Sequence, residues 1–237
     1  MRLARRRLRV EWTDMDKYIV VGVDETRESQ IALQWAVEAA RTRGAAVRVV
    51  RSVYSTPVVY WPTIGAEGYI PVPPLDQCQA ELDEAVDYVR DRLGNDAGSG
   101  RLAYESPAMA ILEHAEGAEM IVLGTKSPNR WQAAVMGSVV TAVTARASCP
   151  VAVVRGEQHD GPIVVGTDGS ADSEAAVEFA FEEANRSGRP LTVVYCWQPI
   201  DRHDQPVADT HAVLRYWLTE ASVPTSRSIR ASSSGRR

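Results

Sequence analysis

The order of apolar and polar residues along the chain predicts strands that alternate with helices. Four apolar runs are typical of strands buried on both faces of a parallel sheet: 17–24, 46–53, 120–124 and 149–155. Apolar residues recur every three or four positions over 28–43 and over 75–93, which is the period of an amphipathic helix. A short strand over 102–105, a helix opened by Ser106-Pro107 and a helix over 137–147 complete the order. Helices that connect successive parallel strands indicate an α/β fold with a doubly wound, Rossmann-like parallel sheet.

One face of each long helix is expected to pack on the sheet. In the first helix this face consists of Ala32, Leu33, Ala36, Val37 and Ala40, and in the second it consists of Leu75, Cys78, Leu82, Val86, Val89 and Leu93. Thr26 or Ser29 can cap the start of the first helix, and Gly44 can end it. Residues 54–74 contain five prolines, so we expect a long loop there, of the kind that often serves function.

The chain repeats its own beginning. Residues 19–24, Ile-Val-Val-Gly-Val-Asp, return at 163–168 as Ile-Val-Val-Gly-Thr-Asp. The second copy continues with a helix over 172–187, a strand over 190–197 and a helix near 206–221. Nothing after it matches the later strands of the first copy, which suggests a truncated tandem protein. The expected organisation is a basic disordered extension (1–16), a first domain (17–156), a partial second domain (162–223) and a disordered tail (224–237).

Composition and charge exclude several classes of function. The chain carries 26 Lys+Arg and 31 Asp+Glu, a net charge of −5, and nine of its arginines lie within 1–10 and 225–237. The acidic remainder is a poor match for a phosphate backbone, so we expect no nucleic-acid partner. No run of 18 apolar residues predicts a membrane span. The three cysteines form no CxxC pair, which favours a reducing cytoplasm, and the four histidines show no metal-ligand spacing.

The first 14 residues do not read as a signal peptide. Their arginines resemble a charged leader, but Glu11, Asp14 and Asp16 interrupt any apolar stretch behind them. Met15 stands just before the first strand, so translation can start at Met1 or at Met15.

Candidate chemistry lies where strands end, since open α/β sheets bind ligands beyond the carboxyl ends of their strands. Asp24 ends the first strand, and Gly124 ends the fourth. The loop that follows, with Lys126 and Arg130, leads to Gly137-Ser138 at the start of a helix, where backbone N–H groups can face an anion. Each of these residues also has a purely structural explanation, because aspartates and glycines of this kind cap helices and form turns.

The segments Ile19–Asp24, Tyr104–Ala108, Ile121–Gly124, Gly137–Val139 and Cys149–Arg155, in this order, resemble the universal stress protein family, and the repeat resembles its tandem form. The resemblance implies a five-stranded sheet in the order 3-2-1-4-5. It also implies an ATP site with Asp24 and Ser52 near the adenosine, and a glycine loop of pattern G-x2-G-x9-G-[ST]. In that loop Gly124, Gly137 and Ser138 match the pattern, and Ser127 replaces the second glycine. Mg²⁺ is expected beside ATP phosphates.

The resemblance implies a stress-response protein that senses ATP in its first domain and is not an efficient enzyme, although a weak ATPase activity stays open. A homodimer through the last strand, here Val151–Arg155, is implied as well. The alternative is a member of the family that binds no nucleotide and acts through dimerisation and protein partners. Ser127 favours this alternative, since a loop that requires positive φ there would exclude serine. A third hypothesis, an ATP-cleaving or adenylyl-transferring enzyme, has no support in the sequence.

Overall fold

The described part of the first 158 residues folds as a doubly wound parallel sheet. The computed structural model describes residues 17–54, 74–125, 137–156, 161–168, 170–195 and 228–231, which belong to two compact units, Met1–Gln158 and His159–Arg237. The strands of the first unit are β1 (Tyr18–Val23), β2 (Ala46–Ser52), β3 (Gly98–Ala103), β4 (Met120–Gly124) and β5 (Val151–Val154). Its helices are α1 (Arg27–Arg43), α2 (Leu75–Leu93), the short 3₁₀ turn η1 (Asn95–Ala97), α3 (Pro107–His114) and α4 (Ser138–Thr144).

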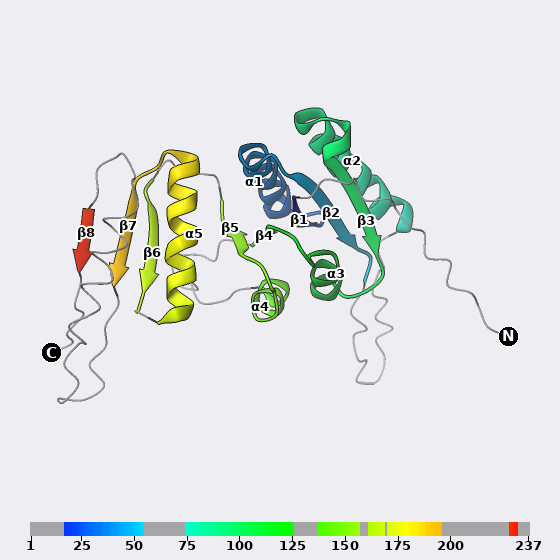
Figure 1. Cartoon of the computed structure of the whole chain (residues 1–237). Coiled ribbons are helices and arrows are strands. Elements are labelled where there is room, and N and C mark those ends of the chain that lie inside the picture. Colours follow the sequence, from blue (N-terminus) through cyan, green and yellow to red (C-terminus); the bar gives the residue numbers. More distant parts are fainter. Residues whose placement is uncertain are drawn as a thin grey trace, which may run out of the picture. The chain divides into compact units, whose positions relative to one another are not determined.

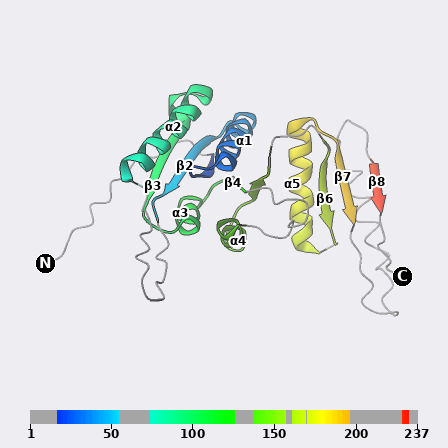
Figure 2. The ribbon, with the colours of Figure 1, turned by 180° about the vertical axis from the view of Figure 1, so that it is seen from behind.

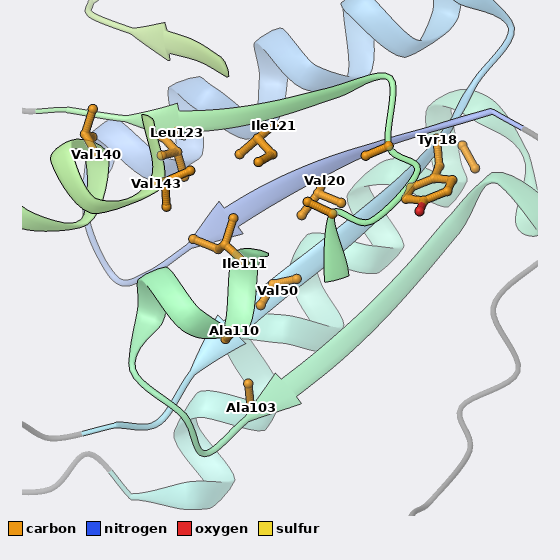
Figure 3. Packing of buried hydrophobic residues seen from close by; sticks show 13 residues of the cluster. Tyr18, Val20, Val50, Ala103, Ala110, Ile111, Ile121, Leu123, Val140 and Val143 are labelled. Carbon is orange, nitrogen blue, oxygen red and sulfur yellow. The ribbon is translucent and has the colours of Figure 1, made fainter. Parts of the chain in front are cut away.

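The sheet has the strand order β3-β2-β1-β4-β5, with all pairs parallel, which confirms the expected topology. Helices α1 and α2 cover one face of the sheet, and α3 and α4 cover the other (Figure 1). Strand β1 lies in the middle, and Ile19, Val20 and Val21 are fully buried, because helices pack on both of its faces. On the α3 and α4 face, Val20, Val50 and Leu123 meet Ile111 and Val140 in one apolar cluster (Figure 3).

The predicted buried face of α1 is confirmed, since all five of its apolar residues are buried and Thr26 caps the helix start. In α2 the prediction holds for Cys78, Leu82, Val86 and Val89, whereas Leu93 is only partly buried. It is wrong for Leu75, which is 51% exposed. The reason is length. The 19 residues of α2 span about 28 Å at 1.5 Å per residue, whereas the six residues of β3 span about 20 Å. The first turn of α2 therefore extends beyond the sheet.

Strand β3 begins at Gly98, earlier than the predicted strand over 102–105. Glycine is depleted in strands, so the apolar pattern did not indicate a strand at Gly98 and Gly100. In the structure they let α2 approach closely. A Cβ at Gly100 would lie 2.6 Å from Val86 Cγ2, and a Cβ at Gly98 would lie 2.9 Å from Arg90 Cγ. The helix over 137–147 is likewise shorter than predicted and runs over Ser138–Thr144.

The second unit contains a smaller parallel sheet with the order β6-β7-β8 and one described helix. Its elements are β6 (Ile163–Thr167), α5 (Ala171–Ser187), β7 (Leu191–Tyr195) and β8 (Ser228–Ala231), and both views show α5 beside the sheet (Figures 1 and 2). Strand β8 lies within 224–237, which we expected to be disordered, and it supplies a third strand that the sequence pattern did not reveal. The strand β8 is formed by backbone hydrogen bonds to β7, which do not require an apolar pattern in its sequence. The predicted helix near 206–221 lies outside the described residues.

Candidate functional site

A cavity of about 130 Å³ opens at the carboxyl ends of β1, β2 and β4 in the first unit. Its wall is mostly apolar, with a few polar groups from the strand ends and from the loop before α1. The lining residues are Gly22, Val23, Asp24, Thr26, Ser29, Val50, Arg51, Ser52, Pro107, Ile111, Leu123, Gly124, Val139 and Val140. Three of the predicted site residues, Asp24, Ser52 and Gly124, therefore meet at one cavity, although they come from three different strands. The described residues enclose less space than the roughly 300 to 1,000 Å³ of a typical small-molecule site.

Asp24 shapes the turn between β1 and α1. Its Oδ1 accepts hydrogen bonds from the backbone N–H of Thr26 at 3.0 Å and from the Thr26 hydroxyl. Thr26 in turn caps α1 by accepting from the N–H of Ser29. Asp24 is exposed, and its second carboxylate oxygen has no hydrogen-bond partner among the described residues. The aspartate thus has a structural role and still presents one acceptor at the cavity rim.

The second unit builds the same turn from the repeated sequence. Asp168 Oδ1 accepts from the N–H of Ser170 at 2.9 Å, and Ser170 caps α5 by accepting from the N–H of Ser173. Hydrogen bonds from the side chain and backbone of Ser170 lower the pKa of Asp168 from 3.8 to about 2. The turn therefore follows from local sequence, and an aspartate after the first strand is not in itself a sign of ligand binding.

This lowered pKa predicts how the second turn responds to acid. A carboxyl group whose pKa is lower in the folded state stabilises that state above its unfolded pKa, and the contribution is lost as pH falls from about 4 through about 2. A ¹³C titration of the Asp168 carboxyl in the full chain should give a midpoint near 2. Ser170→Ala should raise it towards 3.8, and Ser187→Ala, which removes an exposed hydroxyl bond at the other end of α5, should not. A wild-type midpoint near 3.8 would contradict the prediction.

Ser52 is buried at the end of β2, and its hydroxyl is already used. It donates to the carbonyl of Glu105 at 2.6 Å and accepts from the N–H of Tyr54 at 3.1 Å. These bonds join the end of β2 to the turn before α3, so Ser52 can offer a ligand at most one further acceptor position.

The two glycines of the predicted phosphate loop have different surroundings. A Cβ at Gly124 would lie 2.3 Å from the Glu28 carbonyl oxygen, so a glycine is required for α1 to pack against the end of β4. A Cβ at Gly137 would meet nothing among the described residues within 4 Å, and its φ of −56° is open to any residue. Packing explains Gly124 but leaves Gly137 unexplained. Gly137 and the exposed Ser138 directly precede Val139, which lines the cavity. Ser127, Lys126 and Arg130 lie outside the described residues.

Arg51 was not among the site residues predicted from the sequence. Its side chain is 7% exposed, and it makes ion pairs with Glu25 at 3.1 Å and with Glu81 at 2.9 Å. An arginine within an apolar strand is seldom buried unless it is paired with an acidic group. The position of Arg51 inside the apolar run 46–53 was therefore a signal that it has such a partner. Its partners lie 26 and 30 residues away along the chain, so sequence spacing could not identify them.

Two further properties concern the described part of the chain alone. No helix in it has the length and apolar character needed to span a bilayer. Nor does any group of three or more His, Cys, Asp or Glu side chains in these ranges form a cluster suited to a metal ion.

Comparison with known proteins assigns the family. The profile of the universal stress protein family matches residues 15–155 and, again, residues 161–221. Universal stress protein Rv2005c of Mycobacterium tuberculosis is 32% identical over 205 residues, which cover 82% of this chain and 69% of the relative.

A solved structure shows the same fold over most of the chain. A universal stress protein from Archaeoglobus fulgidus DSM 4304 matches with a TM-score of 0.67 and 13% identity over 91% of this chain and 79% of that chain. The structure of an Archaeoglobus fulgidus universal stress protein in complex with dAMP is 25% identical, with a TM-score of 0.37, over 58% of this chain and 96% of that chain. On the two-segment profile match and the 32% identity to the mycobacterial relative, this chain belongs to the universal stress protein family.

Proposed function

We propose that the first unit binds ATP and that the protein is a nucleotide-sensing regulator of the stress response. The observation that carries the proposal is the convergence of Asp24, Ser52 and Gly124 on one cavity at the carboxyl edge of the sheet. Ligands of open α/β sheets bind at this edge. Membership of the universal stress protein family is consistent with this function.

Different parts of the cavity wall suit the apolar and the polar parts of the proposed ligand. Val50, Ile111, Leu123 and Val140 offer apolar contacts to the flat faces of the adenine and to the ribose. The second carboxylate oxygen of Asp24 accepts a hydrogen bond from a ribose hydroxyl. No described residue would meet a Cβ at Gly137 within 4 Å, so the phosphates can approach the backbone there, with Ser138 as a hydroxyl donor. Ser127 stays a proposed phosphate contact, and Mg²⁺ would accompany the phosphates.

We propose a binding protein and not an efficient enzyme. Asp24 is the one carboxylate among the described residues that line the cavity, and they include no histidine or cysteine to act as base or nucleophile. We place the protein in the cytoplasm, because Cys78 and Cys149 are free thiols. We propose neither nucleic acid nor membrane as a partner.

A second candidate function is the formation of a homodimer that recruits protein partners without nucleotide. The observation that favours it is the position of β5 at the edge of the sheet, where it pairs with β4 alone among the described strands. An edge strand presents unpaired backbone groups to another chain. A measurement of nucleotide binding distinguishes the two functions, because only the first requires it.

Titration calorimetry of the full chain with Mg-ATP tests the proposal. We expect saturable binding, weakened at least about tenfold by Asp24→Asn, because a hydrogen bond to a charged acceptor contributes about 1.5 to 3 kcal/mol. Asparagine keeps the Oδ1 that accepts from Thr26 and changes the free oxygen. Asp168→Asn is the matched control, since the same substitution in the repeated turn should leave affinity unchanged. If the wild-type chain binds no ATP at millimolar concentration, the nucleotide function is wrong and the dimer function takes its place.

A further inference from the structure

A three-residue ion network crosses the first unit at the wall of the cavity, which Arg51 helps to line. Arg51, on β2, places its guanidinium between Glu25 in the loop before α1 and Glu81 on α2. Its Nη1 also donates to the carbonyl of Ser52 at 2.9 Å, so all three nitrogens have a partner. The Arg51 side chain is 7% exposed, whereas the side chains of Glu25 and Glu81 are 67% and 25% exposed.

The network reaches the turn that carries Asp24. Glu25 stands between Asp24 and Thr26, whose mutual hydrogen bonds form that turn. Among the described residues, the other side-chain hydrogen bonds of this turn are short-range and come from Thr26 and Ser29, which lie within five residues of Asp24. The pair of Glu25 with Arg51 is the one ion pair in the described residues that ties this turn to a distant strand.

We propose that Arg51 is a positioning residue that, through Glu25, holds the Asp24 turn in the conformation that receives the nucleoside. This inference deepens the nucleotide-binding function proposed above, and its ligand part rests on it. Arg51 itself need not touch the nucleoside. Its buried charge gives the Glu25 carboxylate a fixed partner, and a pre-ordered turn spares the ligand the cost of ordering it.

The alternative is that the network serves burial alone, because an arginine inside a protein requires carboxylates whatever the nearby turn does. The two explanations differ for Glu25. If the network serves burial alone, Glu81 and the Ser52 carbonyl keep Arg51 partnered and removal of the Glu25 charge leaves the turn unchanged. If Arg51 positions the turn, removal of that charge releases it while the rest of the unit stays folded, since Glu25 is mostly exposed.

The experiment compares Glu25→Gln with Glu119→Gln in the full chain. Glu119 pairs with Lys17 at 3.4 Å at the opposite, amino-terminal end of the sheet, so its substitution is a matched loss of one carboxylate. The first readout is the hydrogen-exchange protection factor of the Thr26 and Ser29 amides in the free protein. A protection factor already corrects for the intrinsic exchange rate of each amide. We expect Glu25→Gln to lower it about fivefold, as the loss of about 1 kcal/mol of local stability would do, and Glu119→Gln to leave it unchanged.

The second readout is the affinity for adenosine, which carries no charge, so the lost carboxylate does not alter the attraction of ligand to protein. We expect Glu25→Gln to weaken adenosine binding about fivefold and Glu119→Gln to have no effect. In an Arg51→Met chain, Glu25→Gln should add nothing to either readout, since the pair is already absent. If Arg51→Met does not fold, the comparison of the two glutamate variants still decides.

Unchanged protection of Thr26 and Ser29 in Glu25→Gln overturns the inference. Lower protection with unchanged adenosine affinity overturns it too, because the turn is then held without consequence for binding. If the wild-type chain binds neither adenosine nor ATP, the proposed function fails, and the protection factors alone decide whether Arg51 holds the turn.

Discussion

Replacing Gly124 with alanine should lower the free energy of unfolding of the first unit by about 3 kcal/mol, as overpacking of a close contact does. The added Cβ would lie 2.3 Å from the carbonyl oxygen of Glu28 and 2.9 Å from the backbone nitrogen of Ser29. Both atoms belong to the first turn of α1, which cannot move aside without losing its contacts with β1 and β4. Native-state hydrogen exchange of β1 and β4 amides measures this loss for the first unit separately.

Gly137→Ala is the matched control, because the same methyl group would meet no described residue within 4 Å, at an ordinary φ. We expect a change of less than about 1 kcal/mol, the balance between reduced chain entropy and a weaker helix cap. A similar loss in both variants would contradict the assignment of Gly124 to packing.

Val20→Ala should lower the free energy of unfolding of the first unit by about 2 to 3 kcal/mol, from lost burial and the cavity left behind. Val20 is fully buried at the centre of the sheet, in contact with the apolar cluster beneath α3 (Figure 3). Exchange protection of the β1 and β2 amides reports the change.

The repeat supplies the control for this prediction. Val164 occupies the same place in the second copy but is 61% exposed, so Val164→Ala should change the stability of the second unit by less than about 0.5 kcal/mol. If instead it lowers the stability of that unit as much as Val20→Ala lowers that of the first, the exposed face of β6 is covered in solution.

Much of the fold was predictable from the sequence. The short apolar runs and the spacing of Ala32, Leu33 and Ala36 indicated strands and an amphipathic helix, because both patterns follow from the local period of the backbone. The start of β3 and the third strand of the second unit were not predictable. Gly98 has no side chain to reveal a strand, and β8 depends on backbone bonds to a distant partner.

The candidate site was predictable in part. Asp24, Ser52 and Gly124 lie at one cavity, and their hydrogen bonds and packing show that each also serves the fold; their contact with a nucleotide stays a prediction. Arg51 was missed, because its role is defined by partners that the fold brings to it.

The sequence by itself determined the strand, the turn and the helix cap that begin each copy. Asp24 and Asp168 bond to residues two positions ahead in nearly identical turns, since such bonds depend on neighbours along the chain. Only the tertiary structure decided how deeply each copy of this repeated segment is buried and which residues it contacts. Val20 is buried where Val164 is exposed, and a Cβ at Gly22 would meet Ile111, where one at Gly166 would meet no described residue within 4 Å. Burial and ion pairing depend on residues far away in sequence, and the described parts of the two copies bring different residues to the same short motif.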